Sequence, residues 1–186
     1  SGNIFLGDTP LQDYDMTSWR HSCGVVLQDS HVFSESLERN IAVEDQHIDS
    51  TRLRIAARQS NLEEFIEKLP LKYQTMVGAE GVGLSRGQEQ RIFIARALYK
   101  YPSFVFLDES TNSLDANNER IITCNLLDFF KGRTVLIVAH RLSTIRHADK
   151  IVVLHKGRIV EEGTHDELCA RHGYYYELIN NQLIAM

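Results

Sequence analysis

The chain has 186 residues, of which 43% are hydrophobic and 24% charged, as in an ordinary soluble globular protein. These values exclude a disordered chain, a collagen and a disulfide-stapled scaffold, and the length fits one domain or two small lobes. Asp and Glu outnumber Lys and Arg by 25 to 20, and the resulting net charge of -5 disfavours nucleic acid as the main partner. The apolar runs are far shorter than the ~20 residues of a membrane-spanning helix.

The first half of the chain is predicted to hold two short strands followed by helices. Strand patterns cover residues 2–7 and 24–27. A weak helix pattern covers residues 49–58, and a stronger one begins at Asn61, which can cap a helix. Residues 78–84 contain three glycines, and we expect them to form a loop.

After this loop the pattern alternates between helix and strand. Helices are predicted at 85–100 and 115–130, and strands at 104–107 and 135–139. This order predicts an α/β core with a parallel sheet and right-handed crossovers. A hairpin is predicted around Lys156-Gly157, followed by one C-terminal helix from Asp166 onward.

Two adjacent acids, Asp108 and Glu109, end the apolar strand that starts at Phe104. Ligands of open α/β sheets bind at the carboxyl ends of the strands. Asp108 can bind Mg²⁺ there, and Glu109 can polarise a water molecule for attack on a γ-phosphate. The alternative is that both are solvated acids at a strand end.

Two further strand ends carry polar side chains. His140 follows the strand at 135–139 and can donate a hydrogen bond to a phosphate oxygen. Gln28 follows the strand at 24–27, and its amide can reach a phosphate or a metal-bound water. Each alone is ordinary for a strand end or surface loop, but polar groups delivered to one sheet edge by neighbouring strands favour a site.

The segment from Ser85 to Gln88 opens a helix directly after the glycine-rich loop. Ser at the N-cap with Gln three residues later is a capping box, which is a complete structural reason for both residues. A helix N-terminus is also an anion site, and the two interpretations are compatible.

The order and spacing of these segments resemble the nucleotide-binding domain of ATP-binding-cassette (ABC) transporters, in particular of exporters. Leu84 to Gln88 is similar to the family signature Leu-Ser-Gly-Gly-Gln, and residues 104–109 resemble the Walker B strand. Ser113 to Asp115 resembles the D-loop, His140 the switch histidine, and residues 26–28 the Q-loop. The resemblance covers essentially the whole chain.

The resemblance implies a P-loop NTPase (RecA-like) α/β fold with a parallel sheet core and a helical subdomain. Residues 1–34 would hold the N-terminal strands and Q-loop of the core. Residues 35–99 would form the helical subdomain with the signature. Residues 100–186 would supply the rest of the core, with Walker B, D-loop, switch histidine and C-terminal helices.

Two departures from the family pattern stand out. Arg86 replaces the glycine at the third position of the signature. None of the 11 glycines is followed by lysine, so the phosphate-binding loop GxxxxGK[ST], the Walker A motif, is absent. In the family this loop precedes a segment like residues 2–7. We therefore expect an N-terminally truncated domain that binds and hydrolyses ATP poorly by itself.

The family implies ATP and Mg²⁺ as the cofactors. Glu109 would position the attacking water, Asp108 and Gln28 would hold Mg²⁺, and His140 would steady the γ-phosphate. The activity implied is that of an ABC-type ATPase, which couples ATP hydrolysis to substrate export.

The implied partners are a second nucleotide-binding domain, in a homodimer, and the transmembrane domain of the exporter. Ser85, Gly87 and Gln88 would complete the ATP site of the second domain, and Asp115 would communicate across the dimer. The expected location is the cytoplasmic face of a bacterial plasma membrane, within an integral membrane transporter.

Two other functions fit parts of the pattern. The chain could be a non-catalytic module that only donates its signature to a partner ATPase subunit. A DNA-repair ATPase with the same cassette would carry a long insertion between the Q-loop and the signature. Residues 29–84 show no sustained heptads and no cysteine pairs, which disfavours that class.

Overall fold

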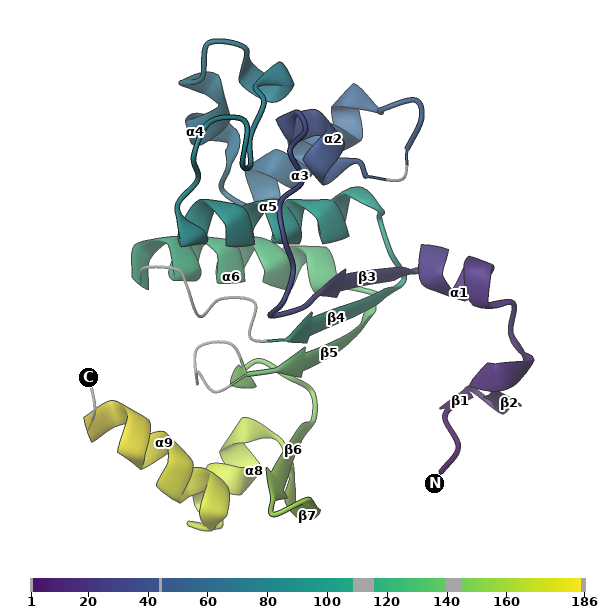
Figure 1. Cartoon of the computed structure of the whole chain (residues 1–186). Coiled ribbons are helices and arrows are strands. Elements are labelled where there is room, and N and C mark those ends of the chain that lie inside the picture. The colour runs from purple at the N-terminus through teal and green to yellow at the C-terminus, as the bar shows by residue number, and fades with distance from the viewer. Residues whose placement is uncertain (1, 44, 109–115, 140–144, 185–186) are drawn as a thin grey trace. The chain divides into compact units, whose positions relative to one another are not determined.

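The computed structural model describes residues 2–43, 45–108, 116–139 and 145–184. Figure 1 shows the course of the chain through these residues. The chain divides into two compact units, Ser1–Leu136 and Ile137–Met186. The predicted domain bounds, 1–34, 35–99 and 100–186, group the residues by the motifs that they carry and not by compact unit. These bounds stay a prediction.

The chain starts with a small arm rather than with the single strand predicted at residues 2–7. Strand β1 (Phe5–Leu6) pairs antiparallel with β2 (Thr9–Pro10). Between them Gly7 has φ 60°, a conformation that suits a tight turn. A 3-10 turn, η1 (Leu11–Asp13), leads to a helix not predicted from the sequence, α1 (Met16–His21).

A three-stranded sheet in the order β3-β4-β5 forms the centre of the first unit. Its strands are β3 (Cys23–Val26), β4 (Phe104–Asp108) and β5 (Thr134–Val138), each within a residue or two of the predicted range. β3 and β4 are parallel, with Val26 opposite Leu107. Alternate side chains are buried on one face, including Val26, Val105 and Leu107.

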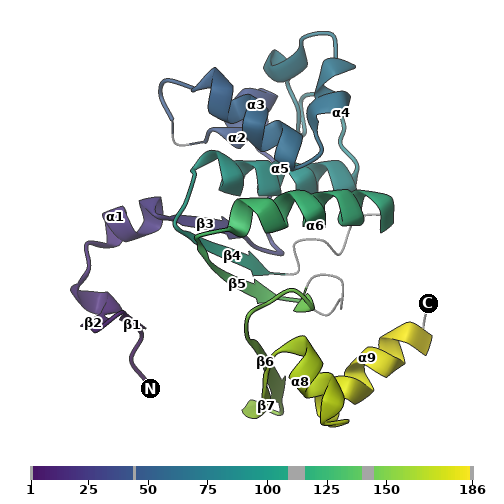
Figure 2. The same ribbon diagram turned by 180° about the vertical axis from the view of Figure 1, so that it is seen from behind.

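Helices α5 (Arg86–Tyr99) and α6 (Ala116–Phe130) lie on one side of this sheet, as Figure 2 shows from behind. Both match the predicted helices. On α6, Ile122, Leu126 and Phe129 are buried at the predicted spacing of one helix face. Strand, helix and strand therefore alternate in the way expected of an α/β core.

A helical lobe stands on the far side of α5 from the sheet (Figure 1). It consists of α2 (Leu37–Ile41), α3 (Ser50–Gln59), α4 (Glu63–Glu67) and a 3-10 turn, η2 (Lys72–Gln74). The predicted helix at 49–58 is confirmed, with Asp49 as its N-cap.

The prediction that Asn61 caps the next helix is wrong. Asn61 has φ 55°, and α4 starts two residues later without a side-chain cap. The Asn61 amide instead donates to Asn118 Oδ1 on α6 at 2.7 Å. A tertiary contact has replaced the local cap.

The second unit contains the predicted hairpin. β6 (Ile151–His155) pairs antiparallel with β7 (Arg158–Gly163). Lys156 and Gly157 both have positive φ, at 48° and 73°, which fits a type I′ turn. Ile151 and Val153 pack from β6 into a small core of buried side chains that also contains Leu168, Tyr175 and Ile179.

The single C-terminal helix predicted from Asp166 is wrong, because two helices form, α8 (His165–Ala170) and α9 (Tyr174–Ile184). The Glu161 carboxylate on β7 accepts hydrogen bonds from the N–H groups of Tyr174 and Tyr175. It thereby caps a new helix start. A side chain at Gly173 would displace this carboxylate, so glycine at the break leaves room for the cap.

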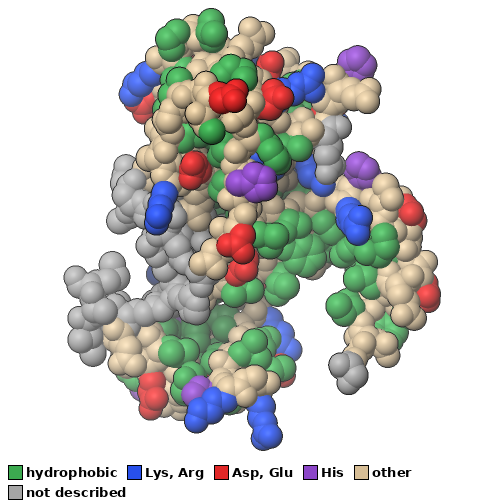
Figure 3. Space-filling view, in the orientation of Figure 1, with side chains coloured by type: hydrophobic (Ala, Val, Ile, Leu, Met, Phe, Trp, Pro, Cys, Tyr) green, Lys and Arg blue, Asp and Glu red, His purple; other side chains and the backbone are tan. Residues whose placement is uncertain are grey.

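None of the helices within the described ranges combines the length and apolarity needed to cross a membrane. On the face shown in Figure 3, Lys and Arg side chains are interspersed with Asp and Glu and form no single basic patch.

Candidate functional site

Asp108 is the last residue of β4 and lies at the carboxyl edge of the sheet. Strand alternation places it on the same face as Phe104 and Phe106, both of which contact the Trp19 ring. The centroids of Trp19 and Phe104 are 4.9 Å apart. The packing of Phe104 and Phe106 against Trp19 therefore holds the strand that presents the Asp108 carboxylate. Asp108 itself is half-buried.

Gln28 lies at the same edge, at the end of the neighbouring parallel strand. Val26 of β3 lies opposite Leu107 of β4. The residue after Val26, Leu27, is therefore level with Asp108, and Gln28 follows one residue later. Gln28 is exposed in a short turn, in which Leu27 N–H donates to Ser30 Oγ at 3.3 Å. The structure thus places two of the predicted site residues at the same edge of the sheet.

The oxygens of Gln28 and Asp108 suit Mg²⁺, which prefers oxygen ligands. No group of three or more His, Cys, Asp or Glu within the described ranges could hold a metal alone.

The segment Ser85–Gln88 forms the predicted capping box at the start of α5. Ser85 Oγ accepts from Gln88 N at 3.3 Å, and Gln88 Oε1 accepts from Ser85 N at 2.8 Å. Ser85 is exposed, Gly87 and Gln88 are half-buried, and the helix that begins at Arg86 is 14 residues long. The positive end of the helix dipole therefore points outward at an accessible N-terminus.

A polar cluster that the sequence did not reveal holds the first turns of α5. Arg91 Nε donates to Gly87 O at 3.2 Å, and Arg91 Nη1 donates to Asn61 O at 2.8 Å. Asn118 Oδ1 accepts from both Arg91 and the Asn61 amide. Because its partners are far apart in the sequence, only the fold could identify this cluster.

Three predicted site residues, Glu109, Asp115 and His140, lie outside the described residues. Their predicted roles therefore stay predictions. The elements that flank them, β4, α6 and β5, have the predicted type and order.

Two cavities open in the first unit. One, of about 430 Å³, lies between the segment after Gln28 and the loop before Ser85, and its lining includes His31, Gly78 and Glu89. The larger, of about 580 Å³, is lined by α1, β3 and α5. Its lining combines apolar and aromatic side chains with cations, among them Trp19, Val25, Phe106, Arg20 and Arg52.

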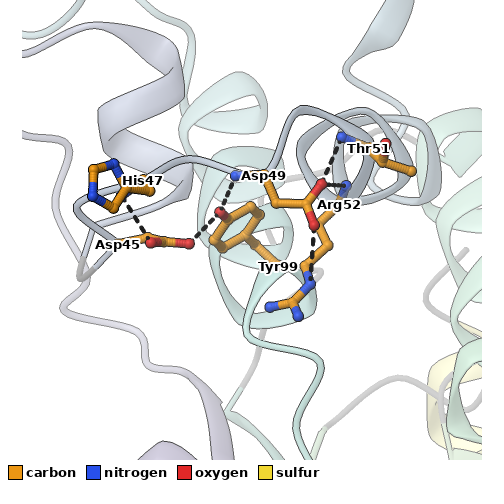
Figure 4. Close-up of polar contacts among 6 residues, drawn as sticks. All are labelled: Asp45, His47, Asp49, Thr51, Arg52 and Tyr99. Atoms are coloured by element: carbon orange, nitrogen blue, oxygen red, sulfur yellow. Dashed lines mark hydrogen bonds and ion pairs between the residues drawn. The ribbon is translucent and has the colours of Figure 1, made fainter.

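One wall of the larger cavity is tied to α5 through Tyr99 (Figure 4). The Tyr99 hydroxyl donates to Asp45 Oδ2 at 2.7 Å and accepts from Asp49 N at 2.9 Å. Asp49 in turn accepts from the N–H groups of Thr51 and Arg52 and so caps α3. The hydrogen bond from Tyr99 is the main cause that lowers the pKa of Asp45, and burial raises the pKa of Tyr99.

Comparison with known proteins connects this geometry to a family. A family model described as "ABC transporter" matches residues 1–112. The chain is 44% identical over 181 residues to an ATP-dependent lipid A-core flippase of Saccharophagus degradans, covering 97% of this chain and 31% of the flippase. It is 44% identical over 182 residues to the putative multidrug export ATP-binding/permease protein YgaD of Bacillus subtilis, covering 98% of this chain and 31% of that protein.

A solved structure shows the same fold. The structure of a bacterial Atm1-family ABC exporter with ATP bound superposes with a TM-score of 0.90 at 37% identity, over 98% of this chain and 32% of the exporter chain. These matches confirm the predicted resemblance and the α/β fold class with a parallel sheet core. The chain spans about a third of the length of each relative.

Proposed function

Because the chain belongs to the ABC transporter family, we propose that it acts as the ATPase domain of an exporter, which couples ATP hydrolysis to substrate export. The observation that carries the proposal is the capping box of Ser85 and Gln88, which presents an open helix N-terminus in the position of the family signature. The names of the relatives, a flippase and a multidrug exporter, support the export function.

In the proposed site, Asp108 and Gln28 hold Mg²⁺ together with the phosphates of ATP. The ion, when bound, neutralises charge that develops on the phosphate oxygens. Glu109 orients the attacking water and draws its proton, and His140 donates a hydrogen bond to the γ-phosphate. The shared sheet edge of Gln28 and Asp108 supports this assignment.

The proposed partner of each site is a second domain of the same kind, most simply an identical one. The N–H groups of the first turn of α5, with Ser85, Gly87 and Gln88, would complete the phosphate site of that partner. Asp115 would communicate between the two sites.

The second proposed partner is the transmembrane domain of the exporter, which would place the chain at the cytoplasmic face of a bacterial plasma membrane. The helical lobe and the Q-loop segment are the proposed contact. The larger cavity supports it, because its mixed apolar and cationic lining suits an amphipathic helix better than a small polar ligand.

The 186-residue chain alone is proposed to bind ATP weakly. Its sequence contains no Gly-Lys pair, and therefore neither the backbone cradle nor the lysine that binds the phosphates in P-loop proteins. Calorimetric titration of this chain with Mg-ATP should show no micromolar binding. A micromolar dissociation constant would contradict the proposal.

The decisive experiment is to sequence the reading frame upstream of Ser1 and to express the polypeptide that it encodes. We expect a phosphate-binding loop, membrane helices and Mg-ATP hydrolysis. Glu109→Gln should abolish hydrolysis while leaving ATP binding intact. A frame without a phosphate loop, or hydrolysis unaffected by Glu109→Gln, would refute the proposed activity.

The second candidate function is a non-catalytic module that donates its signature to a partner ATPase subunit. The observation that favours it is an intact capping box in a sequence that lacks GxxxxGK[ST]. Under this alternative the chain co-purifies with a subunit that carries the loop, and hydrolysis restored by mixing the two is lost in Ser85→Ala.

A further inference from the structure

The segment that follows Gln28 is held by one fully buried side chain. Asn40, with 0% of its surface exposed, accepts from Phe33 N at 2.8 Å through Oδ1. Its amide nitrogen lies within hydrogen-bond distance of the carbonyls of Phe33, Glu35 and Ser36, at 3.0, 3.3 and 3.1 Å. One side chain therefore holds the backbone of three of the four residues 33–36.

Arg96 connects this segment to the signature helix. It lies on α5, 11 residues after Ser85, or about 16 Å along the helix axis. Its Nε donates to Asn40 O at 2.8 Å and its Nη2 to His31 O at 3.3 Å. The guanidinium also lies 5.1 Å from the centroid of the Phe33 ring.

Arg96 acts through hydrogen bonds to backbone carbonyls rather than through an ion pair, and we call the contacts of Arg96 and Asn40 with residues 31–37 the clamp. Across the described ranges no carboxylate forms an ion pair with it, and its hydrogen bonds go to carbonyl groups and to Asn40 Oδ1. Arg96 is half-buried, and this burial lowers the pKa of its guanidinium. A planar fork of donors can engage two carbonyls at once, whereas a lysine cannot hold both in the same geometry.

A second connection joins the same segment to residues 75–78, which lead into the glycine-rich loop before α5. Leu37 N donates to Thr75 O at 3.0 Å, within a bridge between the two stretches. Gly78 then packs so tightly that a Cβ there would lie 3.0 Å from Phe33 O. The chain from Gly78 leads directly into the loop that ends at Ser85. The segment therefore contacts α5 through Arg96, and it also contacts the stretch of chain that leads to Ser85.

We propose that Asn40 and Arg96 are positioning residues that make residues 31–37 and α5 move as one body, so that the position of Gln28 sets the position of Ser85. This inference rests on the proposed function, in which Gln28 senses the nucleotide of its own site and Ser85 serves the partner's site. The clamp would then couple the two ATP sites of the dimer without touching either nucleotide.

The test uses the polypeptide encoded by the complete reading frame. Arg96→Lys keeps the charge but loses the two-carbonyl fork, and Asn40→Asp keeps the shape but loses the amide donors. Each should lower kcat for ATP hydrolysis at least tenfold and change KM less than threefold, because neither residue contacts ATP. An unchanged kcat, or a loss confined to KM, would overturn the proposal.

A matched control is Arg39→Lys. Arg39 adjoins Asn40 in α2, and its side chain also donates to a backbone carbonyl, that of Asp45 at 3.0 Å. Within the described ranges this side chain forms no hydrogen bond with residues 31–37 or with α5, and the backbone N–H of Arg39, which donates to Ser36 Oγ, is unchanged in the variant. It should leave kcat within twofold of wild type. If the Arg39 variant loses as much activity as the Arg96 variant, the clamp has no special role and the proposal fails.

A double-mutant cycle separates coupling from general weakening. Gln28→Ala should lower kcat at least tenfold in the wild type but less than threefold in the Arg96→Lys background, where Gln28 no longer controls Ser85. Additive losses would overturn the proposal. A wild-type polypeptide without ATP hydrolysis would instead refute the proposed function, so the two failures are distinguishable.

If Arg96→Lys does not fold, Phe33→Leu gives a milder perturbation. It removes the ring beside the guanidinium and keeps every hydrogen-bond donor of the clamp. The expected result is a smaller fall in kcat, at least threefold, with KM unchanged. Wild-type kcat in a folded Phe33→Leu protein, together with additive behaviour towards Gln28→Ala, would refute the clamp.

Discussion

Ser85 has two separable roles, as the cap of α5 and as a proposed ligand of the partner's phosphate. Ser85→Ala removes both roles, because alanine has no acceptor at the N-cap. Ser85→Asp removes only the second. Aspartate is an equally good N-cap and accepts the same Gln88 N–H, but its negative charge repels a phosphate.

The size of the capping effect can be derived from the structure. Loss of an N-cap serine typically costs about 0.5–2 kcal/mol of stability. The Gln88 N–H to Ser85 Oγ bond is long, at 3.3 Å, and the reciprocal bond from Ser85 N to Gln88 Oε1 is independent of the Ser85 side chain. We therefore expect the lower half of the range for Ser85→Ala, about 1 kcal/mol or less. That corresponds to about 2–4 °C in Tm for a chain of this size.

Thermal unfolding followed by far-UV circular dichroism measures the first role, and ATP hydrolysis by the complete polypeptide measures the second. Ser85→Ala should lose both a few degrees of Tm and nearly all hydrolysis. Ser85→Asp should recover the Tm and remain inactive. If Ser85→Asp recovers hydrolysis together with Tm, Ser85 is only a helix cap and the reasoning about the signature is wrong.

Three further predictions test other parts of the structure. Gly81→Ala should cost about 1–3 kcal/mol in urea unfolding, because the new Cβ would lie 2.3 Å from Met76 O; an unchanged midpoint would show that the loop adapts freely. Asp45 has a lowered pKa, so its contribution to stability is present above the unfolded value of 3.8 and is lost as pH falls through the folded one. Tyr99→Phe removes the hydrogen bond that is the main cause of the lowered pKa of Asp45. It should therefore destabilise the protein at neutral pH and progressively less in acid, and a pH-independent difference in urea unfolding would contradict this. Glu161→Gln keeps the shape of the α9 cap but removes its charge, and it should lower stability by about 1 kcal/mol in thermal unfolding, whereas an unchanged Tm would leave the carboxylate without a capping role.

Features encoded in a few consecutive residues could be predicted from the sequence. The capping box needs only Ser85 and Gln88, and the structure confirms both of its hydrogen bonds. The strand before Asp108 is a run of apolar residues that is buried on one face, as expected. The hairpin turn at Lys156-Gly157 is likewise local. A type I′ turn needs two residues with positive φ, and glycine adopts that conformation easily.

Features that depend on contacts between distant segments could not be predicted. Asn61 has an N-cap sequence, but its amide binds Asn118, 57 residues away, and the backbone adopts a positive φ. Arg96 and Asn40 are 56 residues apart, and in sequence each is an ordinary helix residue. The new start of α9 depends on a carboxylate from β7, so nothing in the helix itself shows where it begins.

Trp19 is the one tryptophan of the chain, and its place beside Phe104 and Phe106 has a spectroscopic consequence. Its indole lines the larger cavity and packs on the strand that ends in Asp108. Indole fluorescence therefore reports on the first unit alone, both on its unfolding and on any helix that enters this cavity. The second unit holds tyrosines but no tryptophan, so its unfolding is invisible to that signal while contributing to circular dichroism. Comparing the two signals along a single denaturant titration reveals whether the units unfold together, without any label being attached.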